Sequence, residues 1–140
     1  MIKIFDGEYA FLSNFYECPV IYDGIKYANS EAAYHAQKTL SADEREQFTT
    51  LTPSQSKKLG RKITLRPDWE DVKTQIMYEI VLAKFTQNTD IAAKLLATGD
   101  QELIEGNHWN DTCWGVCNGI GENRLGKILM RVREELKSGS

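Results

Sequence analysis

Several features that mark special classes of protein are scarce in this chain. Its 140 residues include only three prolines, three cysteines and two histidines. No apolar run approaches the roughly 20 residues of a membrane-spanning helix. The formal net charge is -3, so no broad basic field is present to attract nucleic acid. Because the remaining composition is that of an ordinary globular protein, we expect one domain over residues 1–140, with no membrane partner and no obligate protein partner.

The cysteine content argues against both a disulfide framework and a zinc site. Three is an odd number, and Cys113 and Cys117 are four residues apart rather than in a C-x2-C pair. His108 would make a third ligand, and only the fold could recruit Cys18 or His35 as a fourth. The N-terminus also lacks a signal-peptide layout. We therefore expect buried, reduced thiols in a cytoplasmic protein, with no metal and no cofactor.

The hydrophobic pattern predicts an α+β fold, a helix-rich single domain with a small sheet. Residues 2–5, 20–27 and 102–106 are typical of strands, and Asp23-Gly24 favours a tight hairpin turn. Helices are expected over 29–40 with Ser30 as its cap, 41–51, 52–63 with Ser54 as its cap and a stop at Gly60, 66–88 opened by Pro67-Asp68, 89–99, and 123–137. In the longest of these, one face is predicted to be buried: Trp69, Val72, Ile76, Ile80 and Phe85.

One face of the helix expected over residues 29–40 combines groups that could perform chemistry. Glu31, then Tyr34 or His35, then Lys38 follow at the spacing of successive helical turns. A carboxylate two turns from a lysine could tune its proton, and a desolvated lysine is a nucleophile toward carbonyl-like carbon. The alternative is a solvated helix face with an incidental charge pair, because charged helix positions are mostly exposed.

The segment from Gly106 to Arg124 is a second candidate site. It contains two of the three tryptophans, Trp109 and Trp114, which could form flat walls for a base or a sugar. Its polar and small residues could hold a ligand closely: Asn107, Asn110, Asp111, Gly115, Asn118, Gly119 and Gly121. The alternative is that both tryptophans are core anchors and the asparagines only make turns.

The stretch GENRLGKI, residues 121–128, matches the beginning of a phosphate-binding P-loop. However, Ile128 stands where a serine or threonine would meet magnesium, and no strand leads into the stretch. The apolar residues that follow it recur at helical spacing. We therefore interpret this stretch as the start of the last helix.

Two long stretches, FLSNFYECPVIYDGIKYANSEAAYHAQK and GDQELIEGNHWNDTCWGVCNGIGENRLGKILMRVREEL, closely resemble the NADAR family, also called YbiA-like. The middle stretch KKLGRKITLRPDWEDVK fits the same family. The resemblance implies an N-glycosidase with a helix-rich α+β fold. It implies activity on riboflavin-pathway phosphoribosylamine intermediates or on ADP-ribosylated guanine. The partner would be a small nucleotide or ribosyl substrate, or ADP-ribosylated nucleic acid.

The resemblance also points to particular residues. It implies catalytic roles for Glu31, Lys38 and Asp111, and a substrate pocket lined by Ser13, Asn14, Phe15, Asn107, Trp109, Trp114 and Gly115. Cys113 departs from the pattern, because many members have an aromatic residue there. Arg61, Lys62 or Arg66 could meet a phosphate.

Two mechanisms remain open at this stage. In one, Lys38 attacks a ring-opened sugar. In the other, Glu31 and Asp111 act as a carboxylate pair. The alternative function is a non-catalytic module that binds ADP-ribose or a related nucleotide, and a scaffold protein is a further alternative.

Overall fold

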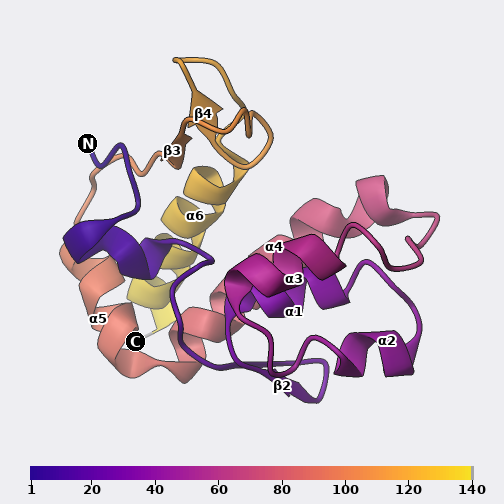
Figure 1. Cartoon of the computed structure of the whole chain (residues 1–140). Coiled ribbons are helices and arrows are strands. Elements are labelled where there is room, and N and C mark those ends of the chain that lie inside the picture. Colours follow the sequence, from indigo (N-terminus) through magenta and orange to yellow (C-terminus); the bar gives the residue numbers. More distant parts are fainter. Residues whose placement is uncertain (140) are drawn as a thin grey trace. The chain divides into compact units, whose positions relative to one another are not determined.

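The structure is a computed structural model, and it describes residues 1–139 (Figure 1). These residues cluster into two compact units. Unit 1 comprises Met1–Ser13 and the chain from Thr89 onward, and unit 2 comprises Asn14–Asn88. Each unit has its own helices and its own small sheet, which confirms the helix-rich α+β class. The single domain expected over residues 1–140 stays a prediction.

Unit 2 begins with the predicted hairpin and continues with four helices. Strands β1 (Val20–Tyr22) and β2 (Ile25–Tyr27) pair antiparallel around Asp23-Gly24. Both turn residues have positive φ, 51° and 79°, as a type I′ turn requires. The helices are α1 (Ser30–Ala36), α2 (Ala42–Glu46), α3 (Pro53–Leu59) and α4 (Trp69–Gln87). The Gln87 amide joins the hairpin to α4, because it both accepts from and donates to the backbone of Ile21.

Helix α4 supplies much of the core of unit 2, as its spacing predicted. Trp69, Ile76, Ile80 and Phe85 are buried, while Val72 is half-buried. Asp68 precedes the helix but makes no side-chain cap, because its carboxylate is paired with the Arg66 guanidinium at 2.6 and 3.0 Å. One member of the buried set was not foreseen: Lys84, whose side chain lies among aromatic rings.

Two predicted helix caps were wrong by one or two residues. Asn29, not Ser30, caps α1, and its side-chain oxygen accepts from the amide of Ala32 at 2.8 Å. Thr52, not Ser54, caps α3 and forms a capping box with Gln55. In both cases two neighbouring residues could serve as a cap, and the residue with extended backbone geometry takes the role. The predicted stop at Gly60 is confirmed, since Gly60 is the C-cap of α3.

Unit 1 contains a 3₁₀ helix η1 (Gly7–Leu12), helices α5 (Thr89–Ala97) and α6 (Arg124–Gly139), and the parallel strands β3 (Gly106–Asn107) and β4 (Val116–Cys117). The expected strands over 2–5 and 102–106 are largely wrong. They reduce to one parallel bridge between Ile2 and Leu103, with β3 starting where the second segment ends. Gly7, with φ of 54°, is the first residue of η1.

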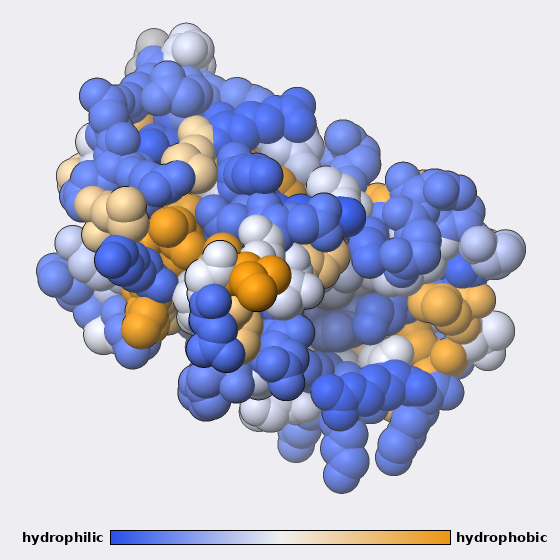
Figure 2. Space-filling view, turned by 90° about the horizontal axis from the view of Figure 1, so that it is seen from above, coloured by the Kyte–Doolittle hydropathy of each residue, from blue (hydrophilic) through white to orange (hydrophobic). Residues whose placement is uncertain are grey.

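In the part of the chain that the structure describes, no helix is both long and apolar enough to cross a membrane. Figure 2 shows one face of the molecule, on which hydrophilic residues predominate and hydrophobic residues occur in small separate patches. Large apolar side chains exposed at the surface include Phe15, Leu40, Leu65 and Trp109. Single exposed apolar side chains are normal on a protein surface, so their exposure alone does not identify a binding site.

Candidate active site

Asn14 fixes the beginning of α1, which carries Glu31. Its carbonyl oxygen accepts from the Glu31 amide at 3.2 Å, and its side-chain oxygen accepts from the Ser30 hydroxyl at 3.0 Å. The Asn14 amide nitrogen contacts the Met77 sulfur of α4 at 3.2 Å. Asn14 is 6% exposed. It therefore holds α1 in place, whereas the neighbouring Phe15 is exposed and Ser13 belongs to unit 1.

Glu31 is a buried carboxylate, and the sequence did not decide whether Tyr34 or His35 is its partner. His35 Nε2 lies 3.0 Å from Glu31 Oε2, and both side chains are buried. Of the two candidates for this face, Tyr34 and His35, the imidazole is therefore the one that meets the carboxylate. The other oxygen, Oε1, has no hydrogen-bond donor among residues 1–139.

Lys38 lies in the turn that follows α1 rather than on the helix itself, which corrects the predicted helix end. The turn is tight, because the Lys38 amide donates to the His35 carbonyl at 3.2 Å. The half-buried Lys38 ammonium lies 5.9 Å from the centroid of the Tyr34 ring. Tyr34 in turn packs against Trp69 with ring centroids 5.2 Å apart. No hydrogen bond to Lys38 Nζ is formed within the described residues.

The surroundings of Lys38 favour its neutral amine. Burial lowers the pKa of the Lys38 ammonium, Glu31 opposes this by raising it, and the positive charges of Arg61 and Lys73 lower it further. The net direction is downward from the ordinary value of 10.5. A lysine of this kind has a larger fraction of nucleophilic amine near neutral pH than an exposed lysine. Glu31 and Lys38 thus interact electrostatically within unit 2.

The tryptophan-containing loop of unit 1 is held by its own side chains. Asp111 Oδ1 accepts from the amides of Cys113 and Trp114 at 3.2 and 2.9 Å. Asn107 Oδ1 accepts from the amides of Trp109 and Asp111, and Asn107 Nδ2 donates to the Asp111 carbonyl at 2.9 Å. The side chains of these two residues therefore hold the loop backbone in its conformation. Asp111 Oδ2 makes no hydrogen bond within the described chain and keeps its accepting capacity.

The two tryptophans of this loop are not both core anchors. Trp109 is 51% exposed and Trp114 is half-buried, whereas the buried tryptophan of the chain is Trp69 in α4. Gly115 is buried, and a Cβ there would overlap the carboxylate and the backbone of Glu105. Gly115 thus permits close packing inside the loop.

The three cysteines are free thiols. Cys18 and Cys117 are buried, and Cys113 is half-buried. Within residues 1–139 no group of three or more histidine, cysteine, aspartate or glutamate side chains is placed to hold a metal ion.

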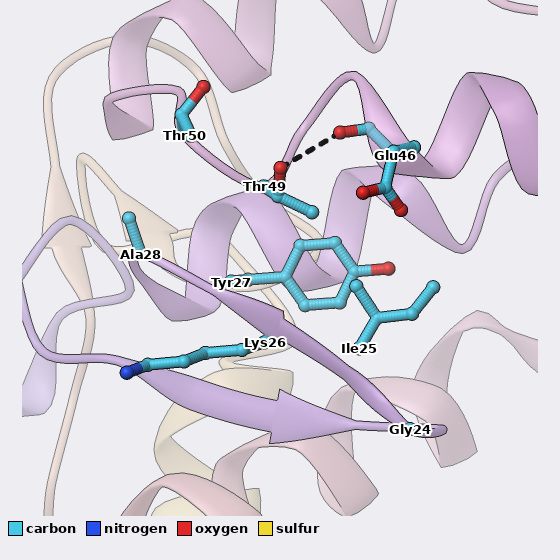
Figure 3. Close-up of a pocket in the computed structure, with 8 residues that line it drawn as sticks. All are labelled: Gly24, Ile25, Lys26, Tyr27, Ala28, Glu46, Thr49 and Thr50. Atoms are coloured by element: carbon cyan, nitrogen blue, oxygen red, sulfur yellow. Dashed lines mark hydrogen bonds between the residues drawn. The ribbon is translucent and has the colours of Figure 1, made fainter.

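Unit 2 also contains a surface groove of about 570 Å³ that includes none of the predicted site residues (Figure 3). It lies beside the hairpin and is lined by Gly24, Ile25, Lys26, Tyr27, Ala28, Glu46, Thr49 and Thr50. Its backbone groups are partly paired with each other, as in the bond from the Ala28 amide to the Thr49 carbonyl. The one carboxylate that lines the groove, that of Glu46, is exposed.

Comparison with known proteins identifies the family of the chain. The model of the NADAR domain family matches residues 3–137. The proteins named N-glycosidase in Shigella boydii (YbiA) and Nostoc punctiforme are 40% and 41% identical over 133 and 137 residues. Those matches cover 92% and 93% of this chain and 82% and 87% of the relatives. The solved structure of Escherichia coli YbiA has a TM-score of 0.86 and 36% identity, covering 99% of this chain and 88% of that one.

A protein of Vibrio vulnificus named for riboflavin biosynthesis is 42% identical over 136 residues, which are 94% of this chain but only 37% of that protein. The relatives named N-glycosidase confirm the enzyme class predicted from the sequence, a hydrolase that acts on N-glycosyl bonds. The chain belongs to the NADAR family.

Proposed function

We propose that this protein hydrolyses the C1–N bond of ribosylamine-type nucleotides, such as ADP-ribosylated guanine or riboflavin-pathway phosphoribosylamine intermediates. The observation that carries the proposal is the environment of Lys38. Its ammonium is half-buried, lacks a hydrogen-bond acceptor within the described residues and has a lowered pKa. Those are the properties of an amine that attacks electrophilic carbon.

The proposed reaction begins from the ring-opened sugar, in which C1 is doubly bonded to nitrogen. The neutral Lys38 amine adds to C1, and the bond from C1 to the leaving nitrogen breaks as that nitrogen takes a proton. C1 is then held as a Schiff base with Lys38. Water adds to C1, and the lysine amine departs with a proton to leave the free sugar.

In this proposal Glu31 stabilises the positive charge at Lys38, and Asp111 supplies the proton. Glu31 raises the pKa of Lys38, so it opposes the effect of burial and stabilises the iminium that replaces the ammonium. Asp111, with one oxygen committed to its loop, protonates the leaving nitrogen with the other or holds the ribose hydroxyls. If Lys38 is not the nucleophile, the two carboxylates stabilise a closed-ring oxocarbenium ion instead.

The remaining residues of the proposed pocket form two groups: those proposed to contact the substrate, and those whose atoms already hold the protein backbone. Trp109, Trp114, Phe15 and Ser13 are proposed to contact the base or the sugar. Asn14, Asn107 and Gly115 are proposed to act by shaping the backbone, since their polar atoms or their packing are already in use. Arg66 is paired with Asp68, which leaves the exposed Arg61 and Lys62 as the phosphate contacts.

The proposal is tested by incubating the purified protein with ADP-ribosylated guanosine and, separately, with a riboflavin-pathway ribosylamine phosphate. Release of guanosine and ADP-ribose from the first compound, or of the free base and the sugar phosphate from the second, measured by chromatography with mass detection, supports the enzyme and selects its substrate. Saturable binding without release would support the alternative of a non-catalytic ADP-ribose or nucleotide-binding module. If the protein neither binds nor cleaves these compounds, both the enzyme and the binding module are overturned.

A further inference from the structure

We propose that His35 is a positioning residue for Glu31, and that Gly60 is the wall against which His35 is held. The inference deepens the proposed function and rests on it, because it concerns how the carboxylate beside Lys38 is oriented. Three observations carry it: the bond between His35 and Glu31, the burial of both side chains, and the close approach of α3 to the imidazole.

The first observation is the hydrogen bond itself. His35 Nε2 lies 3.0 Å from Glu31 Oε2, one helical turn apart on α1. An ionised carboxylate only accepts hydrogen bonds, so we assign the proton of this pair to Nε2. The bond occupies one carboxylate oxygen and leaves Oε1 without a donor in the described chain. A single donor on one oxygen fixes the plane of the carboxylate and leaves the other oxygen for chemistry.

The second observation is burial. The side chains of His35 and Glu31 are only 8% and 11% exposed. A buried carboxylate without a donor would be costly, and water has little access to replace the imidazole. The orientation of Glu31 therefore depends on His35 rather than on solvent.

The third observation concerns the far side of the ring. His35 Nδ1 is buried and has no hydrogen-bond partner within residues 1–139. A Cβ placed on Gly60 would lie 2.6 Å from Nδ1 and 3.0 Å from Cγ of the same ring. The ring is thus held by contact with the Gly60 backbone and not by a second hydrogen bond. Gly60 itself has φ of -58°, a backbone conformation that alanine also adopts, and a Cβ there would lie 3.1 Å from the Ser56 carbonyl oxygen as well as against the imidazole.

This arrangement can be tested by changing the reach of the donor while keeping its chemistry. The glutamine amide nitrogen occupies the position of histidine Nε2, and the asparagine amide nitrogen that of Nδ1. His35→Gln should therefore keep kcat within about threefold. His35→Asn should lower kcat by about 100-fold, the scale of a 1 Å misplacement, with KM changed much less. Equal losses in the two variants, or a loss confined to KM, would overturn the positioning role.

Gly60→Ala tests the wall without altering His35 or Glu31. In the wild-type background it should displace the imidazole and lower kcat by at least about tenfold. In the His35→Gln background the flexible side chain should yield to the new methyl group, so the added loss should be less than about twofold. Thermal unfolding of every variant identifies any that lose kcat by failing to fold. An undiminished effect of the alanine in the double variant would contradict the proposal.

A readout without substrate separates this inference from the proposed function. The chain has two histidines, so ¹⁵N spectra of the ring nitrogens can be assigned with a His108 variant. In the wild type, Nε2 of His35 should be protonated and hydrogen-bonded, and Glu31→Gln should shift that resonance strongly. If the shift is seen but no ribosyl substrate is cleaved, the proposed function fails and the pairing stands. If Glu31→Gln leaves the resonance unchanged, the pairing fails whatever the activity.

Discussion

The backbone amide of Arg66 donates a 2.7 Å hydrogen bond to the carbonyl oxygen of Lys38. This bond joins the turn after α1 to the segment that follows α3, 28 positions along the chain from residue 38 to residue 66. Lys38 is also tied to its own helix through the carbonyl of His35. The backbone that carries the proposed nucleophile is therefore fixed from both sides, and only its side chain retains freedom.

Replacing Lys38 with arginine should preserve binding and abolish turnover. Guanidinium keeps the positive charge and most of the length, but it is not deprotonated at working pH and cannot add to an imine. We expect kcat to fall by at least about 1000-fold, while the dissociation constant for the product sugar phosphate changes little. Borohydride added during turnover should trap a sugar adduct on Lys38 of the wild type, located by peptide mass spectrometry. Near-normal rates in the arginine variant would transfer the mechanism to the carboxylate pair.

The acidic limb of the pH–rate profile should report Lys38. Because burial and the charges of Arg61 and Lys73 lower its pKa, activity should persist to lower pH than an ordinary lysine nucleophile would allow. Lys73→Met removes one of these charges, so the limb should move to higher pH. Lys26→Met, in the exposed part of the hairpin, is the matched control and should leave the limb in place. A limb that moves to lower pH in Lys73→Met would exclude Lys38 as its source.

Lys84 should make stability depend on pH in the alkaline range. Its side chain is 1% exposed and lies over the rings of Tyr16 and Phe85, and burial lowers its pKa from 10.5 to about 8. Between these values the unfolded chain holds the proton and the folded chain does not. The free energy of unfolding should therefore rise with pH across this window, by at most about 1.4 kcal/mol per pH unit.

The measurement for Lys84 is urea unfolding at pH values from 7 to 10, compared with Lys84→Met. The difference between wild type and variant isolates this one group from the other lysines and the tyrosines. Lys94→Met, at an exposed position of α5, should leave the slope of the wild type unchanged. Parallel curves for the wild type and Lys84→Met would show that Lys84 keeps its proton when buried.

Two substitutions of Asp111 should distinguish its structural role in the loop from a role in the chemistry. Asp111→Asn retains an oxygen that accepts from the amides of Cys113 and Trp114, so the loop should fold and Tm should change little. The charge is lost, so kcat should fall by about 100-fold or more. Asp111→Ala removes the acceptor too and should also destabilise unit 1, by about 1–3 kcal/mol. Full activity in the asparagine variant would limit Asp111 to holding the loop.

Chelation should leave activity unchanged, because the donor set around Cys113 and Cys117 lacks the ligand number of a zinc site. The test is prolonged dialysis against a strong chelator, followed by the substrate assay and by elemental analysis of the purified protein. Stoichiometric zinc whose loss removes activity would overturn this interpretation of the thiols.

The parts of the fold that were predictable from the sequence are those set by local rules. Asp23-Gly24 determined the hairpin, and the apolar spacing of residues 69–85 determined α4. The cap of α1 could not be predicted from the sequence, because Asn29 and Ser30 are both favoured N-cap residues. Asn14, more than a dozen residues earlier, takes the Ser30 hydroxyl as a hydrogen-bond donor. In the same way, the spacing of the sequence left Tyr34 and His35 equally placed, and only the structure shows that His35 is the partner of Glu31. Neither the buried Lys84 nor the short N-terminal pairing has a local signal.

The loop from Gly106 to Arg124 is held by hydrogen bonds from its own side chains, which has a consequence for engineering this protein. Asn107 and Asp111 supply hydrogen bonds that hold its backbone. A library at positions 108, 109 and 113 that keeps Asn107 and Asp111 would measure how far these bonds alone maintain the loop while its aromatic and thiol side chains vary.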